Sequence, residues 1–303
     1  MRAFLILVLL MGLCFAAGAL LAYPAYLLVH PLNDTWPFHR VAARLAMLLL
    51  LVALLLVLRR LQVRTRADWV FGVPRARFLR TLIVALMLGV GSMLPVAALL
   101  LGLDVRELKV SPDVASLIPA IVGRALLAGL VVAFSEEAFL RGAMFTAIAR
   151  ESGERVAIGL TALIYAALHF LSRVRIAPED VDWGSGLKLL AGTFVTFTQP
   201  LAFVDSFLAL AAVGVLLGMI RARTGHVGIC IGLHAGWVCV IGVLRELSVR
   251  SADSPRAFLA GDYDGVVGWL VFAWAALIAA GYWYFARRGS PVTAPAFQSR
   301  APR

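Results

Sequence analysis

Two adjacent carboxylates and an arginine interrupt an apolar stretch in the middle of the chain. Glu136, Glu137 and Arg141 lie within FSEEAFLRGAMF, which otherwise has the composition of a membrane helix. An ionisable side chain near the centre of a bilayer costs about 2.5–3.5 kcal/mol on insertion scales, so a cluster of them needs a physical reason. Glu137 and Arg141 share a helix face, where an ion pair lowers the burial cost of both. Glu136 points about 100° away from Glu137, so the same arginine cannot easily satisfy it.

Two histidines occur in other apolar stretches, His169 in LIYAALHF and His234 in IGLHAGWV. At a helical rise of about 1.5 Å per residue, Glu137, His169 and His234 lie roughly 15, 20 and 12 Å from the cytoplasmic ends of their spans. A structural ion pair and two packing histidines are the simplest interpretation of these residues taken singly. Their similar depth favours a site instead, in which carboxylates and imidazoles from three helices converge.

Such a cluster supports two kinds of hydrolytic chemistry. In the first, Glu136, His169 and His234 bind a divalent metal such as zinc, which activates a water molecule and a substrate carbonyl. In the second, no metal is needed: Glu136, helped by His169, takes a proton from the attacking water, and His234 stabilises the oxyanion. Both predict hydrolysis of a peptide bond within the membrane. The sequence contains no HExxH helix, no GxSxG elbow and no pair of intramembrane aspartates.

The elements that carry these residues are membrane helices. Hydrophobic residues make up 62% of the chain and charged residues 15%, and the mean hydropathy is +0.91. Eight apolar stretches are long enough to cross a hydrocarbon core of about 30 Å, so we predict an all-α polytopic bundle of about eight transmembrane helices. The expected spans are 3–29, 41–58, 78–101, 116–147, 156–172, 203–222, 226–246 and 263–286. The first is too long for a secretory signal and is expected to remain as a helix.

The net charge of +11 is explained by membrane topology rather than by nucleic-acid binding. Arginines gather between spans on one side, chiefly in the Arg59–Arg80 segment, and Arg221 and Arg223 count among these cytoplasmic charges. The bias predicts that both termini are cytoplasmic. The cysteines, which show no metal or disulfide spacing, are interpreted as packing residues; they are Cys14, Cys230 and Cys239.

The order of these motifs resembles the CPBP family, also called the Abi family, which contains CAAX-processing endopeptidases and bacteriocin-processing or self-immunity proteins. The resemblance rests on EExxxR, on an aromatic residue four positions before a histidine, and on a later histidine. It implies that Glu136 activates water with His169, that Glu137 and Arg141 support the site, and that His234 serves the oxyanion. Both the metal-dependent and the glutamate mechanism remain open for this family, and we favour the glutamate mechanism.

Two positions depart from the family pattern. Tyr165 replaces the usual phenylalanine, and Val238 stands where an Asn or Asp usually follows the histidine by four residues. A valine side chain neither donates a hydrogen bond nor binds a metal, so another donor such as Trp237 would have to assist, or activity would be reduced or lost. Two alternatives therefore stay open: a proton- or ion-coupled transporter, and a non-catalytic bacteriocin-immunity or scaffold protein.

The predicted organisation has three parts: residues 1–115 with the first three transmembrane helices, residues 116–246 with the catalytic core, and residues 247–303 with the last helix and a short disordered tail. We predict an intramembrane endopeptidase in a bacterial inner membrane. Its partners would be lipid and a membrane-tethered or membrane-delivered peptide, and prenylated CAAX tails are implied by the resemblance alone.

Overall fold

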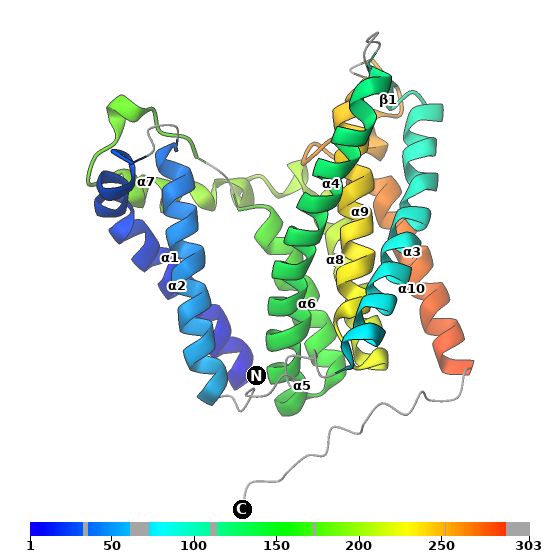
Figure 1. Cartoon of the computed structure of the whole chain (residues 1–303), viewed down its shortest axis with the longest axis horizontal. Helices are drawn as coiled ribbons and strands as arrows, with labels where there is room; N and C mark the ends of the chain where they lie inside the picture. Colours follow the sequence, from blue (N-terminus) through cyan, green and yellow to red (C-terminus); the bar gives the residue numbers. More distant parts are fainter. Residues whose placement is uncertain (33–35, 61–72, 110–113, 172–173, 252, 289–303) are drawn as a thin grey trace, which may run out of the picture. The chain divides into compact units, whose positions relative to one another are not determined.

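The computed structural model describes residues 1–32, 36–60, 73–109, 114–171, 174–251 and 253–288. They are mainly helical (Figure 1), which confirms the predicted all-α bundle. Within these ranges, seven helices are long and apolar enough to cross a membrane. The chain is therefore an integral multi-pass membrane protein. The predicted tail after Arg288 and the greater part of the Arg59–Arg80 segment lie outside the described residues.

The helix boundaries lie within a few residues of most predicted spans. The long helices are α1 (Arg2–Val29), α2 (Phe38–Arg60), α3 (Arg75–Gly102), α4 (Val114–Glu137), α8 (Val204–Thr224), α9 (Gly228–Leu247) and α10 (Trp269–Arg288). A π-helix, η1 (Ala138–Met144), and α5 (Phe145–Ser152) continue α4 without a break. The predicted span 156–172 corresponds to α6 (Glu154–His169), whose 16 residues extend about 24 Å.

The remaining elements are short. They are β1 (Arg106–Leu108), β2 (Ser248–Arg250), α7 (Ser185–Thr193) and the 3-10 helices η2 (Pro178–Asp180), η3 (Val195–Thr198), η4 (Pro200–Ala202) and η5 (Ala257–Leu259). The last transmembrane helix begins later than the predicted position 263 because a turn precedes it. Gly265 has a φ of +74°, and the Asp264 carboxylate accepts hydrogen bonds from the backbone N–H groups of Val266 and Val267.

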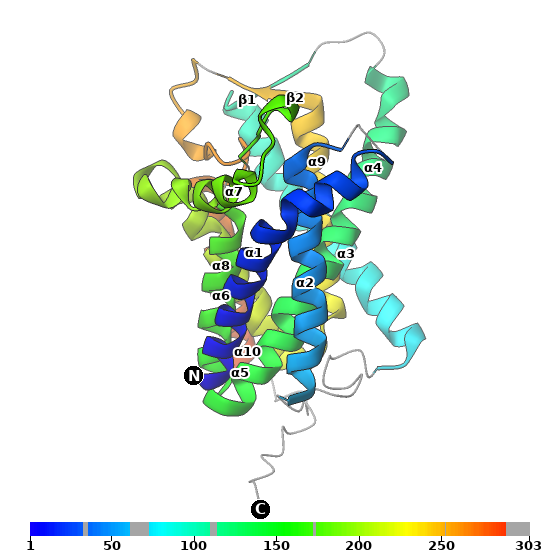
Figure 2. The ribbon, with the colours of Figure 1, turned by 90° about the vertical axis from the view of Figure 1, so that its left-hand side faces the viewer.

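Contacts divide the chain into two compact units, one formed by Met1–Arg64 and Ala167–Leu201, the other by Thr65–Ala166 and Ala202–Arg303. In the first unit, α1 and α2 pack along each other (Figure 2) and α7 packs on α1. The approach is close at Gly18, where an added Cβ would lie 2.9 Å from the Cβ of Ala46. The predicted three-part organisation of the chain is a functional division and stays a prediction.

In the second unit, α9 packs against both α3 and α4, while α8 packs against α10 (Figure 1). The backbones of α3 and α9 approach closely because glycines face the opposite helix. A Cβ at Gly236 would lie 2.6 Å from the carbonyl oxygen of Leu86, and one at Gly89 or Gly232 would also collide with backbone. The helix that carries His234 is therefore held tightly on α3.

A small polar cap closes one end of the second unit. The strands β1 and β2 follow α3 and α9 and pair in antiparallel fashion, with Arg106 opposite Arg250. The Arg106 guanidinium is buried beneath this ribbon. It donates from Nε to the Ser248 hydroxyl at 2.7 Å, from Nη2 to the Ser248 carbonyl at 2.8 Å and from Nη1 to the Gly265 carbonyl at 2.7 Å. These bonds tie the ends of α3 and α9 to the turn that precedes α10.

Candidate active site

The two glutamates lie where α4 gives way to the π-helix. Glu136 and Glu137 are the last residues of α4, and Arg141 lies inside η1. A π turn widens the helix by one residue, and such bulges occur frequently at functional sites. The shift in pairing is visible at Phe145, whose backbone N–H bonds to the Leu140 carbonyl, five residues earlier.

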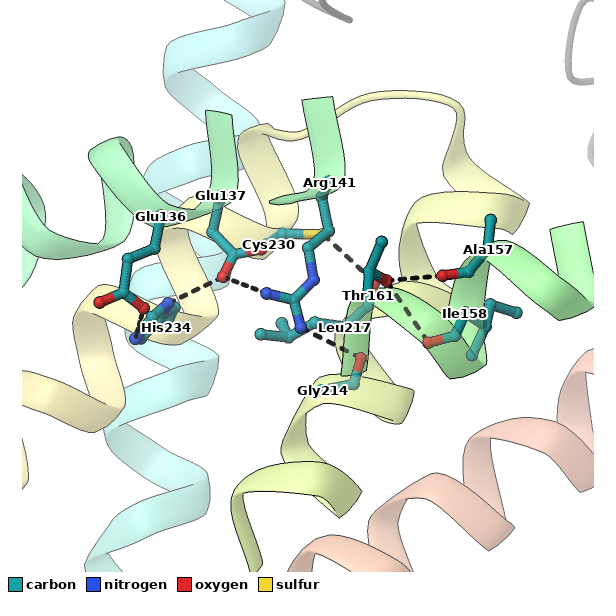
Figure 3. A network of polar contacts seen from close by, with 10 residues as sticks. All are labelled: Glu136, Glu137, Arg141, Ala157, Ile158, Thr161, Gly214, Leu217, Cys230 and His234. Atoms are coloured by element: carbon teal, nitrogen blue, oxygen red, sulfur yellow. Dashed lines mark hydrogen bonds and ion pairs between the residues drawn. The ribbon is translucent and has the colours of Figure 1, made fainter. Parts of the chain in front are cut away.

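Glu137 and Arg141 form the ion pair that their spacing predicts. Arg141 Nη1 lies 3.0 Å from Glu137 Oε1, and both side chains are fully buried. Arg141 Nη2 donates to the carbonyl of Gly214 in α8 at 3.1 Å (Figure 3). A buried charge pair is stable only when further hydrogen bonds satisfy it. The Gly214 carbonyl supplies one of them from a different helix.

His234 of α9 joins the pair from the opposite side. Its Nδ1 lies 2.9 Å from Glu137 Oε1, while its Nε2 lies 3.9 Å from Glu136 Oε2 (Figure 3). An ionised carboxylate only accepts hydrogen bonds, so a Glu137 held ionised by Arg141 receives the proton of Nδ1. Nε2 is then directed towards Glu136.

The Tyr165 ring closes one side of the cluster. The Arg141 guanidinium carbon lies 4.8 Å from the centroid of this ring, and the His234 ring meets it edge to face at 5.8 Å. Aromatic faces attract guanidinium groups, and edge-to-face packing fixes the angle between two rings. Tyr165, the departure from the usual phenylalanine, thus keeps the aromatic packing surface.

The two carboxylates differ in their surroundings. The Glu137 side chain is fully buried, whereas 32% of the Glu136 side chain is exposed. Among the described residues, Glu136 Oε2 and Glu137 Oε2 have no hydrogen-bond partner. Glu137 Oε1 is therefore bonded to both Arg141 and His234. Glu136 is the carboxylate that a water molecule or substrate can reach. This arrangement suits one structural and one reactive carboxylate.

Four of the five predicted site residues come together, from α4, η1 and α9. They are Glu136, Glu137, Arg141 and His234. The fifth, His169, is the last residue of α6, one turn after Tyr165. It falls in the first compact unit. Its role beside Glu136 stays a prediction.

Glu136, His169 and His234 are the predicted metal ligands. A structural or catalytic zinc site has at least three protein ligands. Glu136 and His234 face each other, but no group of three or more His, Cys, Asp or Glu side chains in the described part of the chain is placed to hold a metal ion. Glu136 and His234 are two of the three predicted ligands, and binding of a divalent metal stays a prediction.

The Trp237 indole, a predicted donor in place of Val238, is engaged by a neighbouring helix. Its indole N–H donates to the Ser92 hydroxyl of α3 at 2.9 Å. This bond supports the alternative that Trp237 packs in the helix interface. His234 and Arg141 both direct donors towards the cluster.

Arg221 is a residue whose burial the sequence did not reveal. It was counted among the cytoplasmic charges, yet its side chain is only 1% exposed and contacts the π-helix. The available signal was its position at the end of an apolar span, seven residues after Gly214, which is two helical turns on the same face. That spacing alone could not reveal what the face contacts.

Residues 118–240 match the family model described as Type II CAAX prenyl endopeptidase Rce1-like. The match begins in α4 and ends in α9, so it includes every residue of the cluster. No curated protein and no solved structure matches the chain. The resemblance predicted from EExxxR and the two histidines is confirmed, and residues 118–240 carry the sequence signature of the type II CAAX prenyl endopeptidase family.

Proposed function

We propose that the protein is an intramembrane endopeptidase in which Glu136 activates the attacking water. The observation that carries this proposal is the contrast between the two carboxylates. Glu137 is fully buried and accepts from Arg141 and His234, whereas Glu136 is partly exposed and faces His234 across 3.9 Å. A general base must be accessible and close to the group that stabilises the developing charge.

The proposed step begins with water beside Glu136. The carboxylate takes one proton as the water oxygen bonds to the carbonyl carbon of the peptide. His234 donates from Nε2 to the oxyanion that forms on the carbonyl oxygen. The tetrahedral intermediate then collapses, the C–N bond breaks, and the proton held by Glu136 passes to the leaving amine. Glu136 returns to the carboxylate and a new carboxyl terminus leaves the site.

The role of His234 requires a particular protonation state. Its Nδ1 donates to Glu137, so Nε2 can donate to an oxyanion only when the ring is the imidazolium. The carboxylates of Glu136 and Glu137, on its two sides, offset that charge. Glu137 and Arg141 then serve to orient the ring. His169 is proposed to assist Glu136, as the family resemblance implies.

The surroundings and the matched family support one substrate class. The site lies within an apolar helix bundle, which suits a peptide that the membrane delivers. The name of the family model makes a prenylated CAAX peptide the first candidate, and an exported peptide with an apolar segment the second. We further propose a bacterial inner membrane location with both termini in the cytoplasm, from the distribution of arginines.

Cleavage by detergent-purified protein tests the proposal. Wild type, Glu136→Gln and His169→Ala are compared on a farnesylated CAAX peptide, its unprenylated form and an apolar leader peptide, each with and without a chelator. We expect Glu136→Gln to lower cleavage by about 10²-fold or more. The control Glu246→Gln, which changes an exposed ion pair with Arg124, should cleave as wild type does.

The outcomes separate the alternatives. Loss of cleavage on chelation would favour the metal-dependent mechanism over the glutamate mechanism. Full activity in Glu136→Gln would reject the proposed base. A well-folded wild type that cleaves none of the peptides would favour the immunity or scaffold alternative, and Glu137-dependent ion uptake in liposomes would favour the transporter.

A further inference from the structure

Arg221 is a buried cation of α8 that the proposed reaction does not use. Its Nε donates to the backbone carbonyl of Arg141 at 2.9 Å, and its Nη2 donates to the Thr146 hydroxyl at 3.2 Å. Its guanidinium carbon lies 5.1 Å from the centroid of the Phe145 ring. These contacts are a carbonyl, a hydroxyl and an aromatic face, all provided by η1 and α5. Removing a guanidinium from water is unfavourable, so its burial here needs a specific reason.

The reason lies in the hydrogen bonds of the π-helix. In an α-helix the N–H of Phe145 would bond to the carbonyl of Arg141, four residues earlier. Here that N–H bonds instead to Leu140, because the π turn pairs residues five apart. The Arg141 carbonyl thereby loses its α-helical donor. A buried carbonyl with an unmade hydrogen bond destabilises the fold, and Arg221 Nε donates to this one.

The same face of α8 also contacts the other end of Arg141. The Gly214 carbonyl accepts from Arg141 Nη2 at 3.1 Å, and Gly214 lies two turns before Arg221. One helix thus accepts from the Arg141 side chain and donates to the Arg141 backbone. Gly214 also lies close to α6, because an added Cβ would lie 2.8 Å from the Cα of Ala162. Arg141 is fixed at both ends.

We propose, resting on the proposed function, that Arg221 is a positioning residue of the active site: it stabilises the π-helix and so holds the Glu137–Arg141 pair in register with His234. If η1 returned to α-helical pairing, the residues before it would turn by about 100° relative to α5. Glu137 would then lose its 2.9 Å contact with His234 Nδ1. Glu136, the next residue back, would turn with it.

The first test compares Arg221→Gln and Arg221→Lys in the full-length protein on whichever peptide the wild type cleaves. Arg223→Gln is the matched control, because it removes a half-buried arginine that lies two residues later in the same helix. We expect Arg221→Gln to lower kcat by about 10²-fold with KM within about twofold, as misplacement by about 1 Å does. Arg221→Lys keeps one donor for the carbonyl and should recover part of that loss. Arg223→Gln should match wild type.

A double-mutant cycle with Arg141→Gln distinguishes positioning from a general effect on folding. If Arg221 acts through Arg141, Arg221→Gln should lower kcat by less than about threefold when Arg141→Gln is already present. A residue that only stabilises the fold would multiply its loss with that of Arg141→Gln, which would overturn the inference. Wild-type kcat in folded Arg221→Gln would overturn it as well.

Two further arms keep the result decisive. If Arg221→Gln does not fold, Thr146→Val takes its place, because it removes only the hydroxyl that orients the Arg221 guanidinium. We expect Thr146→Val to lower kcat about threefold. Unchanged kcat in both Thr146→Val and Arg221→Lys would reject the positioning role. Failure of the proposed function would look different: wild-type cleavage would be absent or would persist in Glu136→Gln, whatever residue stands at position 221.

Discussion

Two buried arginines in the second unit satisfy their charge in different ways. Arg106 in the polar cap donates from all three nitrogens to neutral oxygens, at distances of 2.7–2.8 Å. Arg141 in the candidate active site bonds to the Glu137 carboxylate and to one carbonyl, and its Nε has no partner among the described residues. Burial lowers the pKa of Arg106 from its ordinary value, yet each of its three nitrogens already donates a hydrogen bond.

The difference separates polar networks that stabilise the fold from polar networks that are available for a reaction. A closed network, in which each donor has an acceptor, stabilises the fold and offers no atom to a substrate. An open network keeps partly unbonded atoms inside the protein, which costs stability and is retained where chemistry needs them. The cap is a closed network and the glutamate cluster is an open one.

Removing the cation from the open network should have the largest effect. Arg141→Met leaves the buried Glu137 carboxylate without its counter-charge, which typically costs about 3–5 kcal/mol of unfolding free energy. Unfolding in mixed micelles measures the change. Arg124→Met, in an ion pair whose side chains are 64% and 47% exposed, is the control and should cost at most about 1 kcal/mol. Equal losses in the two variants would contradict the distinction.

Loss of the proposed oxyanion donor should affect rate more than stability. We expect His234→Ala to lower kcat by about 10²–10³-fold, as removal of one oxyanion-hole donor does. Trp237→Phe removes a neighbouring donor that is bonded to Ser92 and should leave kcat within about twofold of wild type. Steady-state kinetics on the cleaved peptide measures both. A larger loss in Trp237→Phe than in His234→Ala would transfer the role to the indole.

The closed network should show the opposite behaviour. Arg106→Met removes three hydrogen bonds and leaves the carbonyl of Gly265 and the oxygens of Ser248 with fewer donors, at about 1–3 kcal/mol for a buried group left unsatisfied. Unfolding free energy should fall, while kcat per folded molecule, determined by active-site titration, should not change. A fall in kcat with the folded fraction intact would show that the cap takes part in function.

The smallest expected effect is a pH dependence at His226, which lies between α8 and α9 and is 8% exposed. Burial, and then the positive charges of Arg77 and Arg221, lower its pKa from the ordinary value. Between that lowered pKa and the unfolded value of about 6.5, the unfolded chain binds a proton that the folded chain does not. Stability should therefore decrease as the pH falls through this window.

Melting temperatures from pH 7.5 to pH 5 test the His226 prediction. His226→Gln removes the titrating group and should flatten the dependence. The difference between the two curves is the quantity to compare. Parallel curves would mean that protonation of His226 is not coupled to folding.

Much of the fold followed from composition, because a span of apolar residues in lipid has few alternatives to a helix. The Glu137–Arg141 pair followed from spacing along one helix. The meeting with His234 was expected from depth and is present in the structure. These predictions succeeded because each depended on one helix or on one coordinate along the membrane normal.

The π-helix and the role of Arg221 could not be predicted. A π turn and an α turn differ by one residue in pairing, and seven residues of η1 are too few to reveal a change of period. The face of α8 that carries Arg221 is decided by contacts between helices, which hydrophobic periodicity does not determine in a bundle that is apolar on all sides. The division of the chain into two compact units is likewise a property of contacts.

The seam between α3 and α9 has a consequence for how this sequence can vary. Gly89, Gly232 and Gly236 leave no room for even one methyl group, whereas Gly91 and Gly123 have open space where a Cβ would stand. The space available therefore permits only glycine at the first three positions, whereas it does not restrict the residue type at the other two. The helix that bears His234 is thus preserved by residues that have no side chain at all.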